Sequence, residues 1–214
     1  MLELPDVPRW VEAHGIAADP DGWRERLGGG FVLGHDAARL MVVAGDVEAT
    51  EVARLAERPH AILVEREDLA LALRGAGRRL ERAILHTLPD PGALPDYEGA
   101  TPLGEVELPK QLADELAWAK RRGTVWSAWV DGEPVSFAYA PWRSPAWFDV
   151  SVDTLPGARQ LGLATVVAAA MIRDERAHGR EPVWGADEAN VASLRLAKRL
   201  GFEPADEIWV CAPS

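Results

Sequence analysis

The sequence predicts an α/β protein in which helices pack on a mixed, mainly antiparallel sheet. Short apolar runs typical of strands alternate along the chain with segments whose apolar residues recur at helical spacing. Between two strand-like runs stands the dipeptide Asp131-Gly132, the strongest short signal for a β-hairpin. A third run leads through a glycine-containing turn into an apolar helix. These observations indicate a sheet that contains a hairpin and is covered by helices.

The N-terminal region follows the order strand, helix, strand, helix, strand. Gly28 to Gly30 is expected to form a flexible turn and not a phosphate-binding loop, because no predicted strand precedes it. The predicted strands span residues 38–45, 61–65 and 79–88, and the predicted helices span residues 47–57 and 68–73.

The C-terminal region opens with an amphipathic helix over residues 109–122 that ends at Gly123. A strand over residues 147–154 follows the hairpin and alternates in polarity. It places Phe148, Val150 and Val152 on one face and Asp149, Ser151 and Asp153 on the other. The other predicted elements are hairpin strands over residues 124–130 and 134–140, a helix that stops at Gly179, a strand over residues 182–186, a helix capped by Asn190 and a last strand over residues 207–211.

A proline-rich segment, residues 88–95, divides the chain into two predicted domains. It holds three prolines and a glycine, a composition typical of a linker. We predict an N-terminal α/β domain over residues 1–95 and a second domain over residues 96–214. The order helix, strand, helix, strand occurs in both, so the first is also interpreted as a degenerate half-repeat.

The composition is that of a folded protein. The chain has 214 residues, 48 % of them hydrophobic, which is too apolar for disorder. No basic segment followed by an apolar run stands at the N-terminus, so no targeting signal is expected. The longest nearly uncharged run, Leu161 to Ile172, has 12 residues, whereas a membrane span needs roughly 20. We expect no membrane partner.

The net charge and the cysteine and histidine content argue against several kinds of binding partner and cofactor. The net charge of −11 argues against nucleic acid and mildly favours a cationic substrate. The single cysteine, Cys211, excludes an internal disulfide and fits a cytoplasmic location. The five histidines lack metal-binding spacing, so no metal is expected. The sequence indicates no oligomeric state.

The turn between the third strand and the apolar helix is a candidate anion site. The first N–H groups of a helix have no intrahelical partners and lie at the positive end of its dipole. Here the N–H groups of Gln160 to Thr165 would face the ligand, Gly162 would let the backbone approach it, and Arg159 would add charge. The pattern predicts a bound pyrophosphate or carboxylate.

Two motifs connect this turn to a known family. The segment Arg159-Gln-Leu-Gly162-Leu-Ala164 resembles the R/Q-x-x-G-x-G/A signature of the GCN5-related N-acetyltransferases (GNAT), and Asn190 to Phe202 resembles the family's second motif. The resemblance covers about residues 101–214. It implies a GNAT-like acyl-CoA N-acyltransferase fold, acetyl-CoA as cosubstrate and an amine acceptor. It would make the first domain a degenerate GNAT half.

The resemblance also implies roles for individual residues. The backbone of Val152 and Thr154 would bind the pantetheine arm, and Asn190 and Ser193 would contact it near the thioester. Trp142 to Trp147 is a candidate lining of an acceptor pocket. The pyrophosphate turn would comprise Arg159, Gln160, Leu161, Gly162, Leu163, Ala164 and Thr165.

One position departs from the family pattern. Many relatives have a tyrosine that protonates the leaving thiolate, and Ala197 stands at the matching position. The general acid is therefore unassigned. A regulatory module that binds acyl-CoA without catalysis remains an alternative, as does a dimerising scaffold.

An amine must lose a proton before it attacks. With a pKa of about 10.4, roughly one molecule in a thousand is neutral near pH 7, so a general base would help. Asp149 is the first candidate, with Asp187 and Glu188 in reserve. Asp149 could equally belong to a solvated strand face. The acceptor is left open between a small molecule, a peptide terminus and a lysine.

Overall fold

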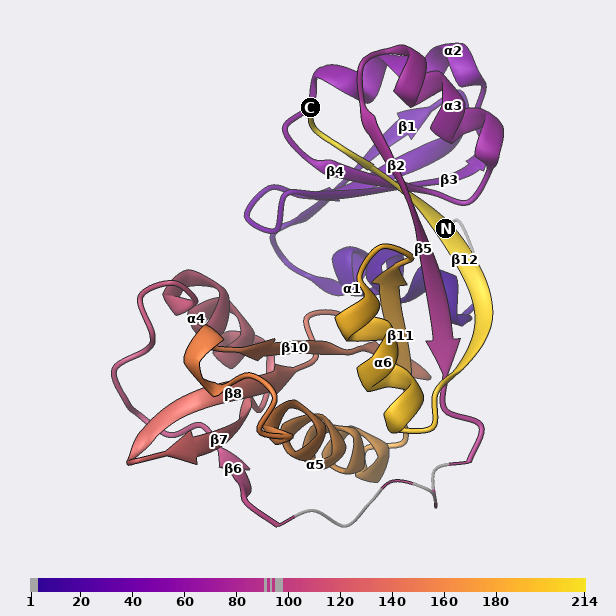
Figure 1. The fold of residues 1–214 in the computed structure, drawn as a ribbon. Coiled ribbons are helices and arrows are strands. Elements are labelled where there is room, and N and C mark those ends of the chain that lie inside the picture. The colour runs from indigo at the N-terminus through magenta and orange to yellow at the C-terminus, as the bar shows by residue number, and fades with distance from the viewer. Residues whose placement is uncertain (1–3, 91, 93, 95–97) are drawn as a thin grey trace.

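The structure is a computed structural model that describes residues 4–90, 92, 94 and 98–214 (Figure 1). It has a mixed α/β architecture with an eight-stranded and a four-stranded sheet. None of the helices in the described part is long and apolar enough to cross a bilayer. The predicted fold class is confirmed.

The described N-terminal part contains every element predicted there and others that the patterns missed. The missed elements are η1, α1 and the hairpin strands β1 and β2. In full, this part comprises η1 (Pro8–Trp10), α1 (Val11–Ala18), β1 (Gly22–Leu27), β2 (Gly29–His35), β3 (Leu40–Asp46), α2 (Ala49–Val52), η2 (Ala53–Glu57), β4 (Ala61–Val64), α3 (Glu67–Gly75) and β5 (Arg79–Thr87).

Glycines hid these elements from the sequence patterns. The expected turn at Gly28 to Gly30 is shorter than predicted: Leu27 pairs with Gly30, so Gly28, with a φ of 58°, and Gly29 connect the paired residues, and Gly29 is already assigned to β2. A Cβ atom on Gly30 would stand 2.3 Å from the carbonyl oxygen of Ala44 on β3. A Cβ on Gly15 of α1 would stand 2.8 Å from the ring of Trp142. Close packing between distant segments, which no local pattern reports, therefore selects these glycines.

The C-terminal part follows the predicted order, with the hairpin turn where it was expected. Asp131 and Gly132 have φ values of 50° and 82°, as a two-residue hairpin turn of type I′ requires. The first helix starts at Ala113, four residues later than expected. The elements are β6 (Ala100–Pro102), α4 (Ala113–Arg122), β7 (Trp126–Val130), β8 (Glu133–Tyr139), β9 (Trp147–Asp149), β10 (Ser151–Thr154), η4 (Pro156–Ala158), α5 (Leu163–Ala177), β11 (Glu181–Asp187), α6 (Val191–Arg199) and β12 (Glu203–Ala212).

The single strand predicted over residues 147–154 is wrong in one respect, because it is two strands in two sheets. β9 pairs in parallel with β11, whereas β10 pairs antiparallel with β8. At the break, the N–H of Val150 donates to the carbonyl of Val183 on β11 at 2.9 Å. The chain changes partner at Val150, so β10 and β11 diverge beyond it and the two sheets separate.

The two predicted domains share the larger sheet. Its strand order is β1-β2-β3-β4-β12-β5-β11-β9. β5 from the first part lies between β12 and β11, and β12 from the second part reaches β4. Figure 1 shows these two strands running side by side along the molecule. Each part therefore gives a strand to the other.

The two parts have the same order of elements, and the half-repeat stays a prediction. In each, a helix and a hairpin precede a third strand, helical residues, a parallel fourth strand, a second helix and a closing strand. The parts differ at the third strand. β3 stays paired with β2 over its whole length, from Leu40 to Asp46, and α2 has four residues where α5 has 15. Only the second part has the opened third strand.

The single cysteine is in the core. Cys211 lies in β12 and is fully buried. Burial raises the pKa of its thiol to about 11, and the thiolate is the reactive form. We therefore expect native protein not to react with a thiol reagent such as DTNB at mildly alkaline pH, and the cysteine to react fully after unfolding. Reaction of native protein at the rate of free cysteine would contradict this burial.

Candidate functional site

A cavity of about 660 Å³ lies where the two sheets separate, between β10, β11 and the N-terminal ends of α5 and α6. Leu161 does not line this first cavity and is 60 % exposed. The structure brings the other predicted binding residues together. The cavity is lined by Val152, Thr154, Arg159, Gln160, Gly162, Leu163, Ala164, Thr165, Asn190 and Ser193.

The turn before α5 leaves backbone donors free. Gln160 and Gly162 have φ values of 67° and 80°, and Gly162 is the N-cap of α5. Within the part of the chain that the structure describes, the N–H groups from Gln160 to Ala164 donate to no protein acceptor. The prediction is wrong for Thr165, whose N–H donates to the Gly162 carbonyl at 3.0 Å. Five free donors at a helix N-terminus suit a polyanionic group.

The open edge of β10 supplies a second set of polar groups. The N–H of Leu155 donates to Val135 on β8 at 2.8 Å, and the N–H of Val150 donates to β11. Because backbone groups alternate in direction along a strand, those of Val152 and Thr154 point away from β8 into the first cavity. There the Thr154 carbonyl accepts a hydrogen bond from Arg159 Nε at 3.3 Å.

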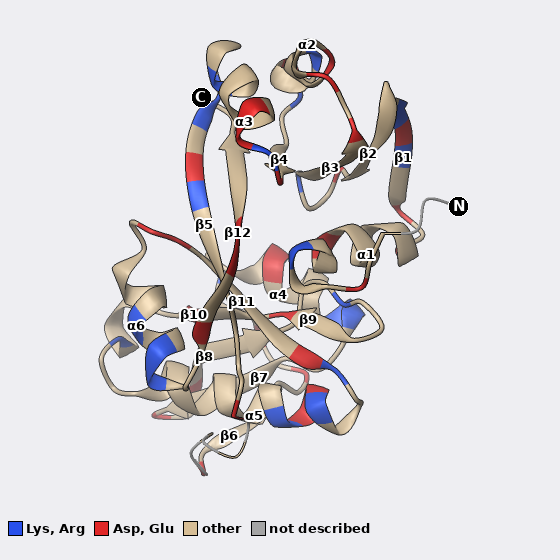
Figure 2. Cartoon of the chain, turned by 90° about the vertical axis from the view of Figure 1, so that its right-hand side faces the viewer, with Lys and Arg blue, Asp and Glu red and all other residues tan. Residues whose placement is uncertain are grey.

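The first cavity is basic although the protein is acidic. Besides Arg159, Arg195 and Arg199 on α6 line it, and Figure 2 shows the basic residues of this helix. Neither arginine on α6 forms an ion pair with any described residue. Sequence reasoning missed both. Their spacing of four residues on a helix that starts at Asn190 is a signal that indicates one common face.

Asn190 and Ser193 hold the start of α6 in place. Asn190 Oδ1 accepts from the N–H of Ser193 at 3.1 Å, which makes Asn190 the helix cap. Ser193 Oγ accepts from Trp184 Nε1 on β11 at 2.9 Å. Both residues therefore have structural partners as well as positions on the first cavity.

Ala197, at the position of the family's tyrosine, is fully buried in the core beneath α6. Tyr97 lies outside the described residues, and Tyr139 stands on β8. Tyr139 is buried, and burial together with the carboxylate of Glu115 raises its pKa well above the ordinary value. A phenol with a raised pKa is a weak proton donor to a thiolate.

Asp149 lies near an acid from the N-terminal part, Glu12. Burial raises the pKa of Asp149, and burial with the nearby charge of Asp149 raises that of Glu12 on α1. Asp149 lines neither cavity. It stands directly before the break at Val150, and its N–H donates to the Trp142 carbonyl at 3.0 Å. No sequence pattern indicated Glu12, which lies in the missed helix.

The two reserve acids have other partners. Asp187 Oδ1 accepts from the N–H of Ala189 at 2.7 Å. Glu188 forms an ion pair with Arg82 on β5, which lowers the pKa of its carboxyl. Like Asp149, neither acid lines the first cavity. The lowered pKa makes Glu188 a weaker base than Asp149, whose pKa is raised.

A second cavity, of about 590 Å³, lies on the opposite face of the β8–β10 sheet, under α4. Ser151 lines both cavities. The wall next to α4 comes from the N-terminal part, at Ala37 and Ala38. Its other lining residues are Asp114, Glu115, Ala117, Trp118, Arg121, Tyr139, Pro141 and Trp142.

Arg122 joins α4 to the N-terminal part beside this cavity. Its guanidinium forms an ion pair with Asp19, contacts His35 Nε2 at 3.1 Å and lies 3.8 Å from the ring centroid of Trp118. Asp19, Asp21 and His35 are near enough to share a cation, but Arg122 already engages two of them. These contacts hold α4 against β2.

Comparisons with known proteins give the same fold. The model of the GNAT acetyltransferase family matches residues 120–210. A GNAT-family structure from Novosphingobium aromaticivorans is 21 % identical, with a TM-score of 0.65 over 98 % of both chains. A GCN5-related N-acetyltransferase-like protein from Streptococcus suis is 17 % identical, with a TM-score of 0.65 over 96 % of this chain and 98 % of that one.

A tandem GNAT protein from the clavulanic acid biosynthesis pathway is 15 % identical, with a TM-score of 0.53 over 96 % of this chain and 95 % of that one. No curated protein sequence matches the chain. The family match and the fold together support an acyltransferase. The chain therefore resembles the GNAT superfamily, in sequence over residues 120–210 and in fold over nearly its whole length.

Proposed function

We propose that the protein transfers an acetyl group from acetyl-CoA to a primary amine. The observation that carries this proposal is the first cavity, where free N–H groups at the start of α5 meet three arginines and the open edge of β10. The turn and the arginines suit the phosphates of the coenzyme. The edge of β10 suits the amide groups of pantetheine, which would bind as an added strand.

In the proposed reaction the neutral amine nitrogen attacks the thioester carbonyl. A C–N bond forms, the C–S bond breaks, and the amine proton passes to Asp149 directly or through water. The thiolate leaves and takes a proton from water. A thiolate has a pKa near 8.5 and is a stable leaving group, so the reaction proceeds without the tyrosine that Ala197 replaces.

The alternative is a module that binds acyl-CoA without catalysis, and the buried Ala197 favours it. Two measurements separate the functions. The enzyme is stabilised against heat by acetyl-CoA and releases free thiol with at least one amine of a broad panel. Stabilisation without thiol release from any amine favours the binding module, and no stabilisation overturns both. Buried Cys211 gives no background in the thiol assay.

We expect the double variant Arg195→Gln, Arg199→Gln to bind acetyl-CoA more weakly. Each lost charge-assisted contact to a phosphate is worth about a factor of ten, so the Kd rises by about 10- to 100-fold. Isothermal titration calorimetry measures this change.

Lys198→Gln is the matched control on the same helix, since Lys198 is exposed and does not line the first cavity. Its Kd is expected to stay within about twofold of wild type. A double variant that binds like the control would remove the α6 arginines from the proposed site.

A further inference from the structure

We infer that the second cavity binds the acceptor, and that the acceptor is a small cationic amine with an apolar or aromatic body. The inference rests on the proposed function and names the substrate class for the same site. It follows from the position of the second cavity, its hydrogen-bonding groups and its walls.

The position is set by residues common to the two cavities. Ser151 lines both. Asp153 lines the first cavity, and its Oδ2 accepts from the hydroxyl of Tyr139, which lines the second, at 2.8 Å. Only β10 therefore separates the two cavities. A molecule in the second cavity approaches this strand from the face opposite to the α5 helix.

The Tyr139 hydroxyl faces two carboxylate acceptors. The Tyr139 hydroxyl lies 2.6 Å from Glu115 Oε1 as well as 2.8 Å from Asp153 Oδ2. A phenol has one proton and can donate to one carboxylate at a time. An alkylammonium group has three donors and a positive charge, so it would satisfy the acceptors that Tyr139 cannot.

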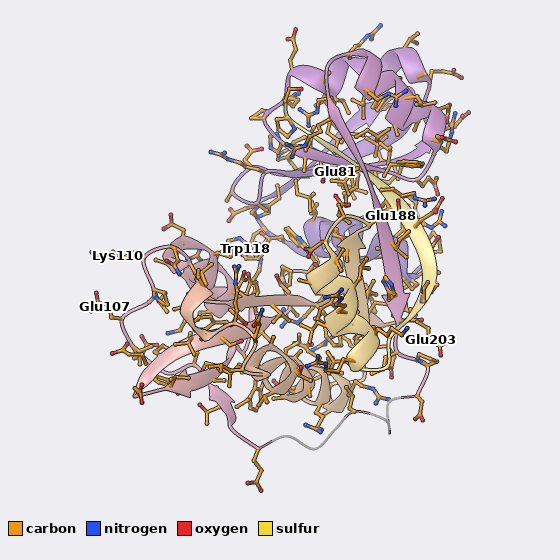
Figure 3. The ribbon with its side chains drawn as sticks, viewed as in Figure 1. Glu81, Glu107, Lys110, Trp118, Glu188 and Glu203 are labelled. Atoms are coloured by element: carbon orange, nitrogen blue, oxygen red, sulfur yellow. The ribbon has the colours of Figure 1, made fainter. Side chains whose placement is uncertain are left out.

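The walls suit an apolar body of limited size. Trp118, Trp142 and Tyr139 supply aromatic surface, which also attracts cations. Figure 3 shows Trp118 on the side of α4 toward the N-terminal part, and its ring packs edge-on against Trp142 with centroids 5.3 Å apart. Ala37 and Ala38 contribute small side chains to the same lining.

The charges of the lining favour a cation over an anion. Asp114 and Glu115 are acidic, and the Tyr139 hydroxyl contacts both Glu115 and Asp153. The one basic residue of the lining, Arg121, donates to the carbonyl of Ala117 on its own helix at 3.2 Å. An amine that also bears two carboxylates would meet this acidic lining unfavourably.

Phenethylamine is the probe, with glutamate as the anionic amine and a lysine peptide as the bulky one. Equilibrium binding to the full chain is measured by calorimetry without acetyl-CoA. We expect phenethylamine to bind at least about tenfold more tightly than the other two. Glu115→Gln, which loses a charged acceptor, is expected to weaken phenethylamine binding about 10- to 100-fold. Ala38→Phe fills the cavity and is expected to do the same. The Kd of acetyl-CoA stays unchanged in both variants.

Glu107→Gln is the control, since Glu107 projects from the outer edge of the C-terminal part (Figure 3). Phenethylamine binding that is unchanged in both cavity variants, or preference for either other amine, overturns the inference. Unfolding melts verify that the variants are folded. Phenethylamine binding is measured without turnover, so the two proposals can fail separately. If phenethylamine binds but no amine causes thiol release, the proposed transferase is rejected and the amine site is retained.

Discussion

Asp149→Asn is expected to lower kcat by about 100- to 10,000-fold, the range that a positioned general base contributes. The amide has nearly the shape of the carboxyl group but cannot accept the amine proton. Asp149 stands beside the break at Val150, where the two sheets separate. The variant should keep its affinity for acetyl-CoA, because Asp149 does not line the first cavity. Steady-state thiol release measures kcat, and calorimetry measures binding.

The pH profile gives a second test of Asp149. Burial raises the pKa of its carboxyl, and only the ionised form is a base. We therefore expect wild-type kcat/KM to rise with pH through this raised pKa, above the ordinary carboxyl range. In Asp149→Asn, kcat/KM should not show this rise with pH. Unchanged turnover and an unchanged profile in the variant would remove Asp149 from the mechanism.

Glu12→Gln is the matched control, since it changes the other member of the pair and retains the base. Burial and the charge of Asp149 raise the pKa of Glu12 in the folded state. The stability that this contributes is present below the ordinary carboxyl pKa and lost as pH rises through the raised one. The variant should therefore be more stable than wild type above that pKa, and should retain most of the activity.

Arg78→Met is expected to lower the free energy of unfolding by about 3–5 kcal/mol, because it removes a buried charged group that makes several hydrogen bonds. The Arg78 side chain is buried and donates to four carbonyls. Three of them, on Ala56, Arg58 and His60, follow α2, and the fourth is Cys211 on β12, at 2.8 Å. Methionine leaves all four without this donor. The C-terminal strand would lose one side-chain contact with the N-terminal part and keep its pairing with β4 and β5.

Arg79→Met is the control at the next residue. The Arg79 side chain is 66 % exposed and pairs with Glu81, a surface contact worth about 0–1 kcal/mol. Thermal melts should show a fall in Tm of about 2–4 °C per kcal/mol for a chain of this size. Equal Tm values for the two variants would show that Arg78 does not hold the strands together.

The turn with free backbone donors was predictable because its chemistry is local. A helix that begins at an αL glycine leaves its first N–H groups free in any fold, so this turn could be identified from consecutive residues. The hairpin at Asp131-Gly132 and the cap at Asn190 were predictable for the same reason.

Three features were not predictable because they depend on contacts between distant residues. The break at Val150 arises from a hydrogen bond to β11, and the alternating pattern of residues 147–154 continues across it. Helix α1 contains a glycine because it packs on Trp142. The exchange of β5 and β12 joins segments over a hundred residues apart.

The sequence by itself determined the α/β class, the GNAT resemblance and the glycine turn with free N–H groups, since periodicity, turn chemistry and helix termini act over a few residues. Tertiary structure decided that the N-terminal part contributes Glu12 beside Asp149 and the alanine wall of the second cavity. It also placed the carboxylates of Glu115 and Asp153 within hydrogen-bond distance of the Tyr139 hydroxyl. Burial and long-range side-chain pairing set these features, and neither is encoded in the spacing of neighbouring residues.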